Sequence, residues 1–533
     1  MPRLRRLLLF AFLTAFCLSY LGPITEGDFF YHLGQGRSIW EGGIVKSVPS
    51  LGLLSQWLGQ LALYLTWRLA GFAGVVILRA AVYIAIIWLL YVLMRKAGVG
   101  FYQRIFFLIL PAHMFISFPS ERPQLFGFLF FALTVFLLEL RRLDDKSRAH
   151  WLVLPVILVW ANVHHGFAIG LASVWIYFIS RAASRLIRRQ PLWPMVQEGA
   201  VALLPLVALA FIPGAFAFMR SAAMSFISPP AYMESIQEYL SPVDAVRLGE
   251  LFPAYWMLLL VAIVTIARTF RNMSPEHILM LSVFGLLPFN GLRFMPFFLM
   301  LSPIVACYNI PKKESWEDSR LLFAGFSLVL ALWLAFTPFS VRPGISREFP
   351  EDAAAFLRQA KPEGKAFNYQ GWAGYLSWSV PEMRIFMPVA DVPNDVDMAY
   401  GEIIWAEQGA AFNMPQWRSL LDAYGLDIII TPGMSPVSGE MFPLIDAIQG
   451  DGQWYLIYSD DTANILVRAA AKNARVITRY SLPKPNIYLQ TISQAKRYLK
   501  DNPRRPVLWR SLGIAHERLG NIKEAEEAYK KVR

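Results

Sequence analysis

Residues 121–143, "ERPQLFGFLFFALTVFLLELRRL", contain the pattern that decides the fold. The apolar run 124–140 is long enough to cross the hydrocarbon core of a bilayer as a helix. An acid and an arginine precede this run, and Arg141 and Arg142 follow it directly. Basic residues gather at the cytoplasmic ends of membrane spans, so the stretch predicts a transmembrane helix whose far end faces the cytoplasm.

The same pattern recurs along most of the chain. The 533 residues are 56% hydrophobic and only 17% charged, and this composition predicts a polytopic α-helical membrane protein. The stretch 51–70, which contains Gln56 and Gln60, reads as an interfacial amphipathic helix instead. We expect about eleven spans, near residues 6–24, 72–94, 102–118, 124–140, 148–163, 166–182, 196–213, 252–270, 275–289, 293–309 and 319–338.

The net charge of +12 reflects the predicted topology of the chain, and we expect no nucleic-acid partner. Basic clusters occur at every second span boundary, which places the N-terminus and all these clusters in the cytoplasm. Residues 1–6 and the following apolar run predict an uncleaved first helix. The outward segments are then 25–71, 119–123, 163–165, 214–251, 290–292 and everything after Ser340.

Three regions are expected. Residues 1–340 form the transmembrane domain, residues 341–480 an extracytoplasmic α/β domain with a hairpin around Ser459–Thr462, and residues 481–533 a pair of helices. The tail matches the tetratricopeptide spacing, with His516 where that pattern prefers tyrosine. The matching residues are Trp509, Leu512, Gly513, Ala525 and Tyr529. A generic helical hairpin is the alternative, and such helices must pack on the α/β domain, on another chain or on further repeats.

Ionisable and amide side chains gather in the outward loops. Charges at membrane depth are costly and tend to be functional, so their convergence on one side predicts a site at the outer bilayer surface. Acids with histidine serve as bases or cation ligands, and arginines bind phosphate. The candidates are Asp28, His32, Arg37, Arg122, Gln124, Asn162, His164, Glu238 and Arg293.

Several motifs resemble known proteins. The stretches "GDFFYHLGQGRSIWEGG", "ERPQLFGFLFFAL", "WANVHHGFAIG", "IQEYLSP", "RFMPFF" and "GWAGYLSW" resemble a bacterial family with a membrane domain like that of GT-C glycosyltransferases, an outward α/β domain and tetratricopeptide repeats. The resemblance implies a multi-pass protein of the bacterial inner membrane. It further implies that a sugar moves from a polyprenyl-phosphate-linked lipid to an extracytoplasmic glycan, lipid or protein.

The resemblance also implies roles for the candidates. Asp28 corresponds to the first-loop acid, a base or a ligand of a divalent cation such as Mg²⁺ or Mn²⁺, and Glu238 to a second acid. The others would bind substrate. Two features depart from the family pattern: the first loop is abbreviated at "KSVPSLGLLSQW", with Gln56 where an acid is common, and "ADVPND" replaces "D-G-R".

Alternatives remain for each residue and for the whole chain. Asp28 could cap a helix beginning at Phe29, and Arg37 and Glu41 could form a solvated pair. His164 and His165 could form a polar turn between two short spans, an interpretation that suits His165 better. Arg122 and Arg293 could extend toward lipid headgroups. The chain could instead be a non-catalytic scaffold for polysaccharide or filament export, with a protein partner at 484–533. A transporter is less favoured, because few charges lie within the spans.

Overall fold

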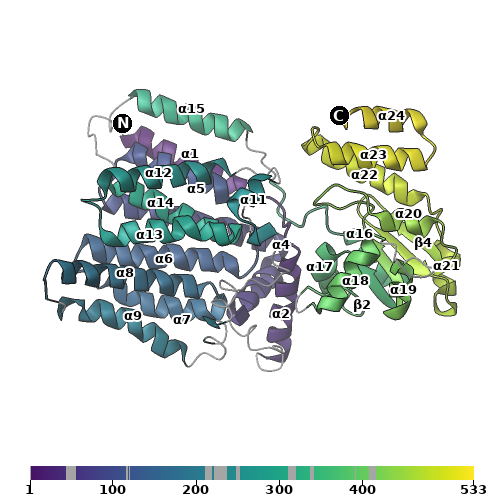
Figure 1. Ribbon diagram of the computed structural model, residues 1–533, viewed down its shortest axis with the longest axis horizontal. Coiled ribbons are helices and arrows are strands. Elements are labelled where there is room, and N and C mark those ends of the chain that lie inside the picture. Colours follow the sequence, from purple (N-terminus) through teal and green to yellow (C-terminus); the bar gives the residue numbers. More distant parts are fainter. Residues whose placement is uncertain are drawn as a thin grey trace. The chain divides into compact units, whose positions relative to one another are not determined.

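The structure is a computed structural model of the chain (Figure 1). It describes residues 2–43, 56–115, 118, 120–191, 193–210, 216, 219–220, 237–247, 252–309, 320–336, 341–389, 392–406 and 416–532. Most of the abbreviated first-loop segment 46–57, residues 390–391, and the ends of the predicted spans 196–213 and 319–338 lie outside these ranges. The chain divides into two compact units.

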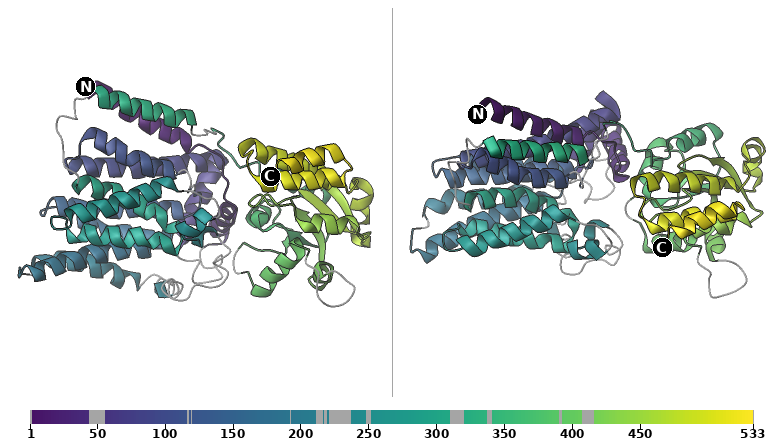
Figure 2. Two further views of the ribbon diagram at one scale, coloured as in Figure 1. Left: turned by 45° about the horizontal axis from the view of Figure 1, so that its top comes forward. Right: turned by 90° about the horizontal axis from the view of Figure 1, so that it is seen from above.

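The first unit is helical and comprises Met1–Glu26 and Gln35–Gly344. Its helices lie side by side in each view (Figures 1 and 2), and the first of them packs against α15. They are α1 (Pro2–Ser19), the end of α2 (Asp28–Gly42), α4 (Trp57–Lys96), α5 (Phe101–Phe115), α6 (Gln124–Leu143), α7 (Val153–Val163), α8 (Phe167–Ile187), α9 (Val196–Leu209), α11 (Pro242–Arg247), α12 (Pro253–Thr269), α13 (Pro275–Leu286), α14 (Met295–Asn309) and α15 (Arg320–Phe336).

Three of the described helices, α4, α6 and α8, are long and apolar enough to cross a membrane. Five shorter apolar helices accompany them in the described ranges, so the total of about eleven spans stays a prediction. Helix α4 joins the predicted interfacial segment to the predicted second span. A kink falls between the two predicted segments, because Gly71 has φ of 63° and ψ of −161°.

Helix α6 is central to the helical unit and packs against α4, α7 and α8. Phe128 and Phe131 of α6 meet Phe297 of α14 edge to face, which suits the quadrupoles of aromatic rings. At Gly170 of α8 a β-carbon would lie 2.3 Å from the ring of Trp160, so only glycine lets α7 and α8 approach so closely. The middle of the bundle is therefore apolar and tightly packed.

Charged networks occupy the ends of α6. At its C-terminal end, Arg142 lies 2.7 Å from Glu139, which also lies 2.9 Å from His277. Arg141 reaches Glu198 of α9 at 3.0 Å. At the other end, Arg122 lies just before α6, and the helix from Gln124 to Arg142 is ~27 Å long. That length is close to the thickness of a bilayer's hydrocarbon core, about 30 Å, as a spanning helix requires.

The second unit comprises Gly27–Gly34 and Ile345–Arg533. Its five-stranded sheet has the order β2-β1-β3-β5-β4. Strands β2, β1 and β3 run parallel to one another, and β5 runs antiparallel to both of its neighbours, β3 and β4. The strands β4 (Trp454–Ser459) and β5 (Asn464–Arg468) form the predicted hairpin. The other elements are α16 (Glu351–Ala360), β1 (Lys365–Asn368), α17 (Ala373–Ser379), β2 (Arg384–Ile385), α18 (Asn394–Ile404), α19 (Gln416–Ala423), β3 (Leu426–Thr431), α20 (Pro443–Gln449) and α21 (Ala474–Tyr480).

The C-terminal helices α22 (Asn486–Asp501), α23 (Pro506–Arg518) and α24 (Ile522–Lys530) pack against this same unit. Ile487, Leu508 and Leu512 belong to the hydrophobic core that also contains strands β3, β4 and β5. A β-carbon on Gly513 would lie 2.5 Å from the ring of Tyr529, so the predicted small residue faces the predicted aromatic one. Of the possible packing partners, the helices thus use the α/β core.

The start of α2 also belongs to the second unit. Phe30 packs edge to face on Phe349 and Tyr375, with ring centroids 4.8 Å away from each. A β-carbon on Gly374 would lie 2.5 Å from the Gly27 carbonyl oxygen, so the two backbones touch where no side chain fits. This contact explains the second glycine of "GWAGYLSW", whereas a β-carbon on the first, Gly371, would lie 2.6 Å from the ring of Tyr369.

We predict that Asp446→Asn loosens the attachment of α23. Burial would raise the pKa of Asp446, but hydrogen bonds from Arg518 and Tyr488 hold that pKa below its usual value. Asp446 therefore stabilises the folded unit above its unfolded pKa, and this contribution disappears as pH falls through the lower folded value. The substitution should cost about 1 kcal/mol, because Arg518 is half exposed.

The measurement is hydrogen–deuterium exchange of the full chain in detergent. Exchange in α20 and α23 should accelerate in Asp446→Asn and stay unchanged in Arg504→Gln, which removes an exposed charge nearby. Equal protection in both variants would contradict the prediction.

Candidate functional site

Four outward loops of the helical unit meet near the start of α4. A β-carbon on Gly59 of α4 would lie 2.6 Å from the Val163 carbonyl oxygen and 2.8 Å from the Pro123 side chain, which brings the second and third outward loops together. The Leu292 amide donates to the Leu240 carbonyl at 3.0 Å, which joins the fourth and fifth. Segments far apart in sequence therefore share one region.

Arg122 connects these loops through two acids. Its Nε lies 2.6 Å from Glu26 Oε2, and its Nη2 forms an ion pair with Glu238 Oε1. The guanidinium is largely buried, with 17% of its side chain exposed. A planar fork of donors can hold two carboxylates at once, whereas the two acids alone would repel each other. We call Glu26, Arg122 and Glu238 the ionic triad.

A buried ion pair supports the loop that carries Arg122. Glu121 is fully buried and pairs with Arg79 of α4, whose Nε donates to the Tyr20 carbonyl at 3.2 Å. Burial raises the pKa of Glu121, and the charge of Arg79 opposes that rise. Removing either partner would leave a buried charge uncompensated, so this pair fixes the loop.

Arg293 lies beside the ionic triad on an aromatic surface. Its guanidinium carbon is 4.0 Å from the centroid of the Tyr239 ring, and Tyr239 directly follows Glu238 in the chain. The Arg293 Nε is buried and has no hydrogen-bond partner among the described residues. An orphaned buried donor is costly, so a ligand that accepts a hydrogen bond there would be stabilised.

The two adjacent histidines have different environments. Gln56 Nε2 lies 3.0 Å from His165 Nδ1. Burial, then the charges of Arg293 and Arg122, lower the pKa of His165 to about 4. His164 accepts a hydrogen bond on Nδ1 from the Gly166 amide at 3.0 Å, which makes it part of the turn between α7 and α8. His165 is thus a neutral imidazole close to two arginines.

The structure brings together only some of the predicted residues. Arg122 and Glu238 are in direct contact, and Arg293 and His164 lie in the same loop cluster. Asp28 and His32 belong to the second unit, where Asp28 is exposed in the first turn of α2 and His32 is buried. The ionic triad forms without them.

The remaining predicted residues have local positions. Arg37 is half buried in α2, and Gln124 begins α6. Asn162 accepts a hydrogen bond from Trp57 Nε1 at 3.0 Å and donates to the Leu158 carbonyl at 2.9 Å, so it anchors the start of α4. These contacts give Asn162 a positional role in the structure.

Sequence reasoning omitted Glu26, Gln56, His165 and Tyr239 from the candidate residues. Glu26 stands two residues before Asp28, and the family pattern drew attention to Asp28 instead. Gln56 was noted only as a departure, yet it contacts His165. The usable signal was the grouping of polar residues in outward loops, because no local pattern says which acid an arginine will meet.

The described residues do not fit a divalent cation. No group of three histidine, cysteine, aspartate or glutamate side chains is placed to hold a metal among them. The two carboxylates that do approach each other are both paired with Arg122. Hard cations need oxygen ligands that are not already neutralised by a guanidinium.

We predict that His165 makes the helical unit sensitive to acid. Its folded pKa of about 4 lies below the ordinary 6.5, so the unfolded chain binds the proton more readily. Stability is then complete above about pH 6.5 and falls as pH decreases toward 4. The melting temperature of the detergent-solubilised wild type should fall between pH 7 and pH 5, and His165→Gln should reduce this slope. If the melting temperatures of the wild type and of His165→Gln fell equally with pH, His165 would not be the group that titrates.

Comparisons with solved structures show the fold. The crystal structure of the Archaeoglobus fulgidus oligosaccharyltransferase in complex with zinc and sulfate matches with a TM-score of 0.50 and 10% identity, over 86% of this chain and 73% of that one. The arabinofuranosyltransferase AftD from Mycobacteria matches with a TM-score of 0.51 and 16% identity, over 87% of this chain. This chain spans 42% of that longer protein.

No protein-family model and no curated protein matches the chain. These two matching structures, among others, are an oligosaccharyltransferase and an arabinofuranosyltransferase. The resemblance predicted from the sequence motifs is therefore confirmed at the level of fold: the chain shares a GT-C-like membrane fold with these two enzymes.

Proposed function

We propose that this chain is a glycosyltransferase that moves a sugar from a polyprenyl-phosphate-linked donor to an extracytoplasmic glycan, lipid or protein. The observation that carries the proposal is the ionic triad beside Arg293, at the outward loops of a GT-C-like fold. Such a transfer needs cationic side chains that bind the phosphate and a carboxylate that accepts the proton of the acceptor.

The donor phosphate would bind at the arginines. Arg293 has an unsatisfied buried Nε among the described residues, and Arg122 could exchange one carboxylate for a phosphate oxygen. As the bond between the sugar carbon and the phosphate oxygen breaks, negative charge develops on the phosphate. Fixed cations stabilise that charge, so both arginines favour the transition state over the ground state.

A carboxylate would accept the proton of the acceptor. The acceptor hydroxyl oxygen forms the new bond to the sugar carbon, and its proton passes to Glu238. Glu238 suits this role because it is 39% exposed on its side chain while Arg122 fixes its position. Asp28 is the other proposed base, and no step is assigned to a metal ion.

Other residues would bind or position the substrate. His32, Arg37, Gln124, Asn162 and His164 keep the substrate-binding roles that the sequence motifs imply. His165 joins them as a neutral imidazole, so it offers hydrogen bonds without adding a third positive charge.

We place the chain in the bacterial inner membrane as a multi-pass protein. The N-terminus would be cytoplasmic, and the second unit extracytoplasmic. The charged layers at the two ends of α6 support this orientation, because the basic cluster of Arg141 and Arg142 lies at the opposite end from the ionic triad.

A non-catalytic scaffold is the second candidate. It depended on a tail that needs a protein partner, but α22, α23 and α24 already bury apolar residues in the core of their own unit. That packing removes the main physical reason to expect a partner at 484–533.

We predict that Arg293→Gln and Arg122→Lys lower sugar transfer from a polyprenyl-phosphate donor by at least a hundredfold, roughly 3 kcal/mol of barrier. Lysine keeps the charge of Arg122 but cannot hold two carboxylates as a planar fork. Transfer is measured with radiolabelled donor in nanodiscs, alongside melting temperature. Arg247→Gln is the matched control, because Arg247 is an exposed arginine of the same unit. Full activity in both test variants would refute the proposed site.

A second experiment decides which acid is the base. Glu238→Gln and Asp28→Asn each preserve size and remove one charge. The variant that replaces the true base should transfer sugar at least a hundredfold more slowly, which is roughly 3 kcal/mol of barrier. The variant of a residue that only caps a helix should lose about 1 kcal/mol of folding stability. If both variants keep full activity, neither carboxylate is the base.

A further inference from the structure

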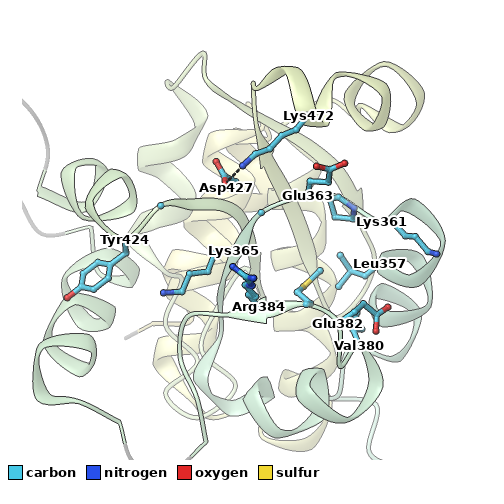
Figure 3. A pocket seen from close by; sticks show the side chains of 14 residues that line it. Leu357, Lys361, Glu363, Lys365, Val380, Glu382, Arg384, Tyr424, Asp427 and Lys472 are labelled. Carbon is cyan, nitrogen blue, oxygen red and sulfur yellow. Dashed lines mark hydrogen bonds and ion pairs between the residues drawn. The ribbon is translucent and has the colours of Figure 1, made fainter.

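The α/β unit contains a cavity of about 880 Å³ at the amino ends of its parallel strands (Figure 3). Lys365 begins β1, Arg384 begins β2, and Gly425 directly precedes β3. The volume falls within the range of about 300–1,000 Å³ that is typical of small-molecule sites. This cavity belongs wholly to the second unit, and its lining includes none of the residues proposed for glycosyl transfer.

Two basic residues face each other across neighbouring strands in this cavity. Lys365 and Arg384 are paired in the register of β1 and β2, and Figure 3 shows them side by side. Neither has an ion-pair partner among the described residues, and the same holds for Lys361 at the rim. Two positive charges on paired positions of neighbouring strands attract an anion together more strongly than either does alone.

The other charges limit what kind of anion fits. Lys472 is neutralised by Asp427 at 2.5 Å, and Glu363 and Glu382 also line the cavity. Among the lining residues, four are basic and three are acidic. A polyanion would meet these acids, whereas a ligand with one acidic group and several hydroxyls would match both kinds of side chain.

An aromatic ring and an apolar wall complete the site. The ring of Tyr424 lies 5.8 Å from Lys365 Nζ, and the Tyr424 hydroxyl is held by Asp395 at 3.1 Å. Figure 3 shows Tyr424 on one side of Lys365 and Arg384 and Leu357 on the other. A flat ring suits the C–H face of a sugar, and apolar side chains beside it can cover the rest of the sugar ring.

We propose that this cavity binds an acidic saccharide, with its carboxylate or phosphate between Lys365 and Arg384 and one sugar face on Tyr424. The proposal does not depend on the function of the helical unit, because its evidence lies entirely in the second unit. Such a site would hold an acidic glycan chain at a cavity whose lining includes none of the residues proposed for transfer.

The experiment measures binding to the full chain in nanodiscs by calorimetry. The probes are a tetrasaccharide of alternating glucuronic acid and N-acetylglucosamine, the neutral tetrasaccharide of N-acetylglucosamine, glucose 6-phosphate and inorganic phosphate. Lys365→Gln and Arg384→Gln should each weaken binding of the acidic tetrasaccharide by about tenfold or more, because each removes a charged hydrogen-bond donor. Lys500→Gln, an exposed lysine outside the cavity, is the matched control.

Each outcome decides the proposal. Binding of the acidic tetrasaccharide or of glucose 6-phosphate that both cavity variants weaken supports it, and the tighter probe shows whether the acid is a carboxylate or a phosphate. The melting temperature of these variants should stay close to that of the wild type, since neither side chain forms an ion pair among the described residues. The proposal would be overturned if the neutral tetrasaccharide or inorganic phosphate bound as tightly as the acidic probes. It would also be overturned if no probe bound, or if the cavity variants bound the acidic probes as the wild type does.

Discussion

Arg122 is the residue on which the arrangement of the helical unit's loops depends. Glu26 and Glu238 are separated by most of the membrane domain in sequence, yet both carboxylates meet its guanidinium. Without that cation, two partly buried acids would repel each other and draw the first and fourth outward loops apart. The buried ion pair of Arg79 and Glu121 holds the loop that carries Arg122, so the fold positions Arg122 before any ligand binds. Preorganised charge of this kind is what electrostatic catalysis requires.

The apolar middle of the bundle explains why these charges gather at its ends. Helix α6 is long enough to span the hydrocarbon core, and its centre carries phenylalanines that pack on α14. Charged side chains therefore form two layers, one around Arg122 and one around Glu139 and Glu198. A lipid-linked substrate has its phosphate at the same depth as such a layer, which gives the proposed site a physical reason for its position.

Much of this organisation could be predicted from the sequence, because it depends on local properties. Length and hydropathy located α6 and α8, and the kink in α4 at Gly71 falls between the predicted segments 51–70 and 72–94. The partners of Arg122 could not be predicted, since they lie in segments that meet only through tertiary packing. Asp28 illustrates the limit: its place after the first span made it the leading acid, but the backbone contact of Gly27 with Gly374 ties its segment to the second unit. The pairing of Lys365 with Arg384 across β1 and β2 likewise depends on strand register, which the composition of the chain does not reveal.

The most direct test of the central claim is a cryo-electron microscopy structure of the full chain in nanodiscs with a polyprenyl-phosphate sugar. The account predicts density for the phosphate within hydrogen-bond distance of Arg293 Nε, with Arg122 still in contact with at least one of Glu26 and Glu238. Phosphate density bound elsewhere on the helical unit, with Arg293 Nε still without an acceptor, would contradict it.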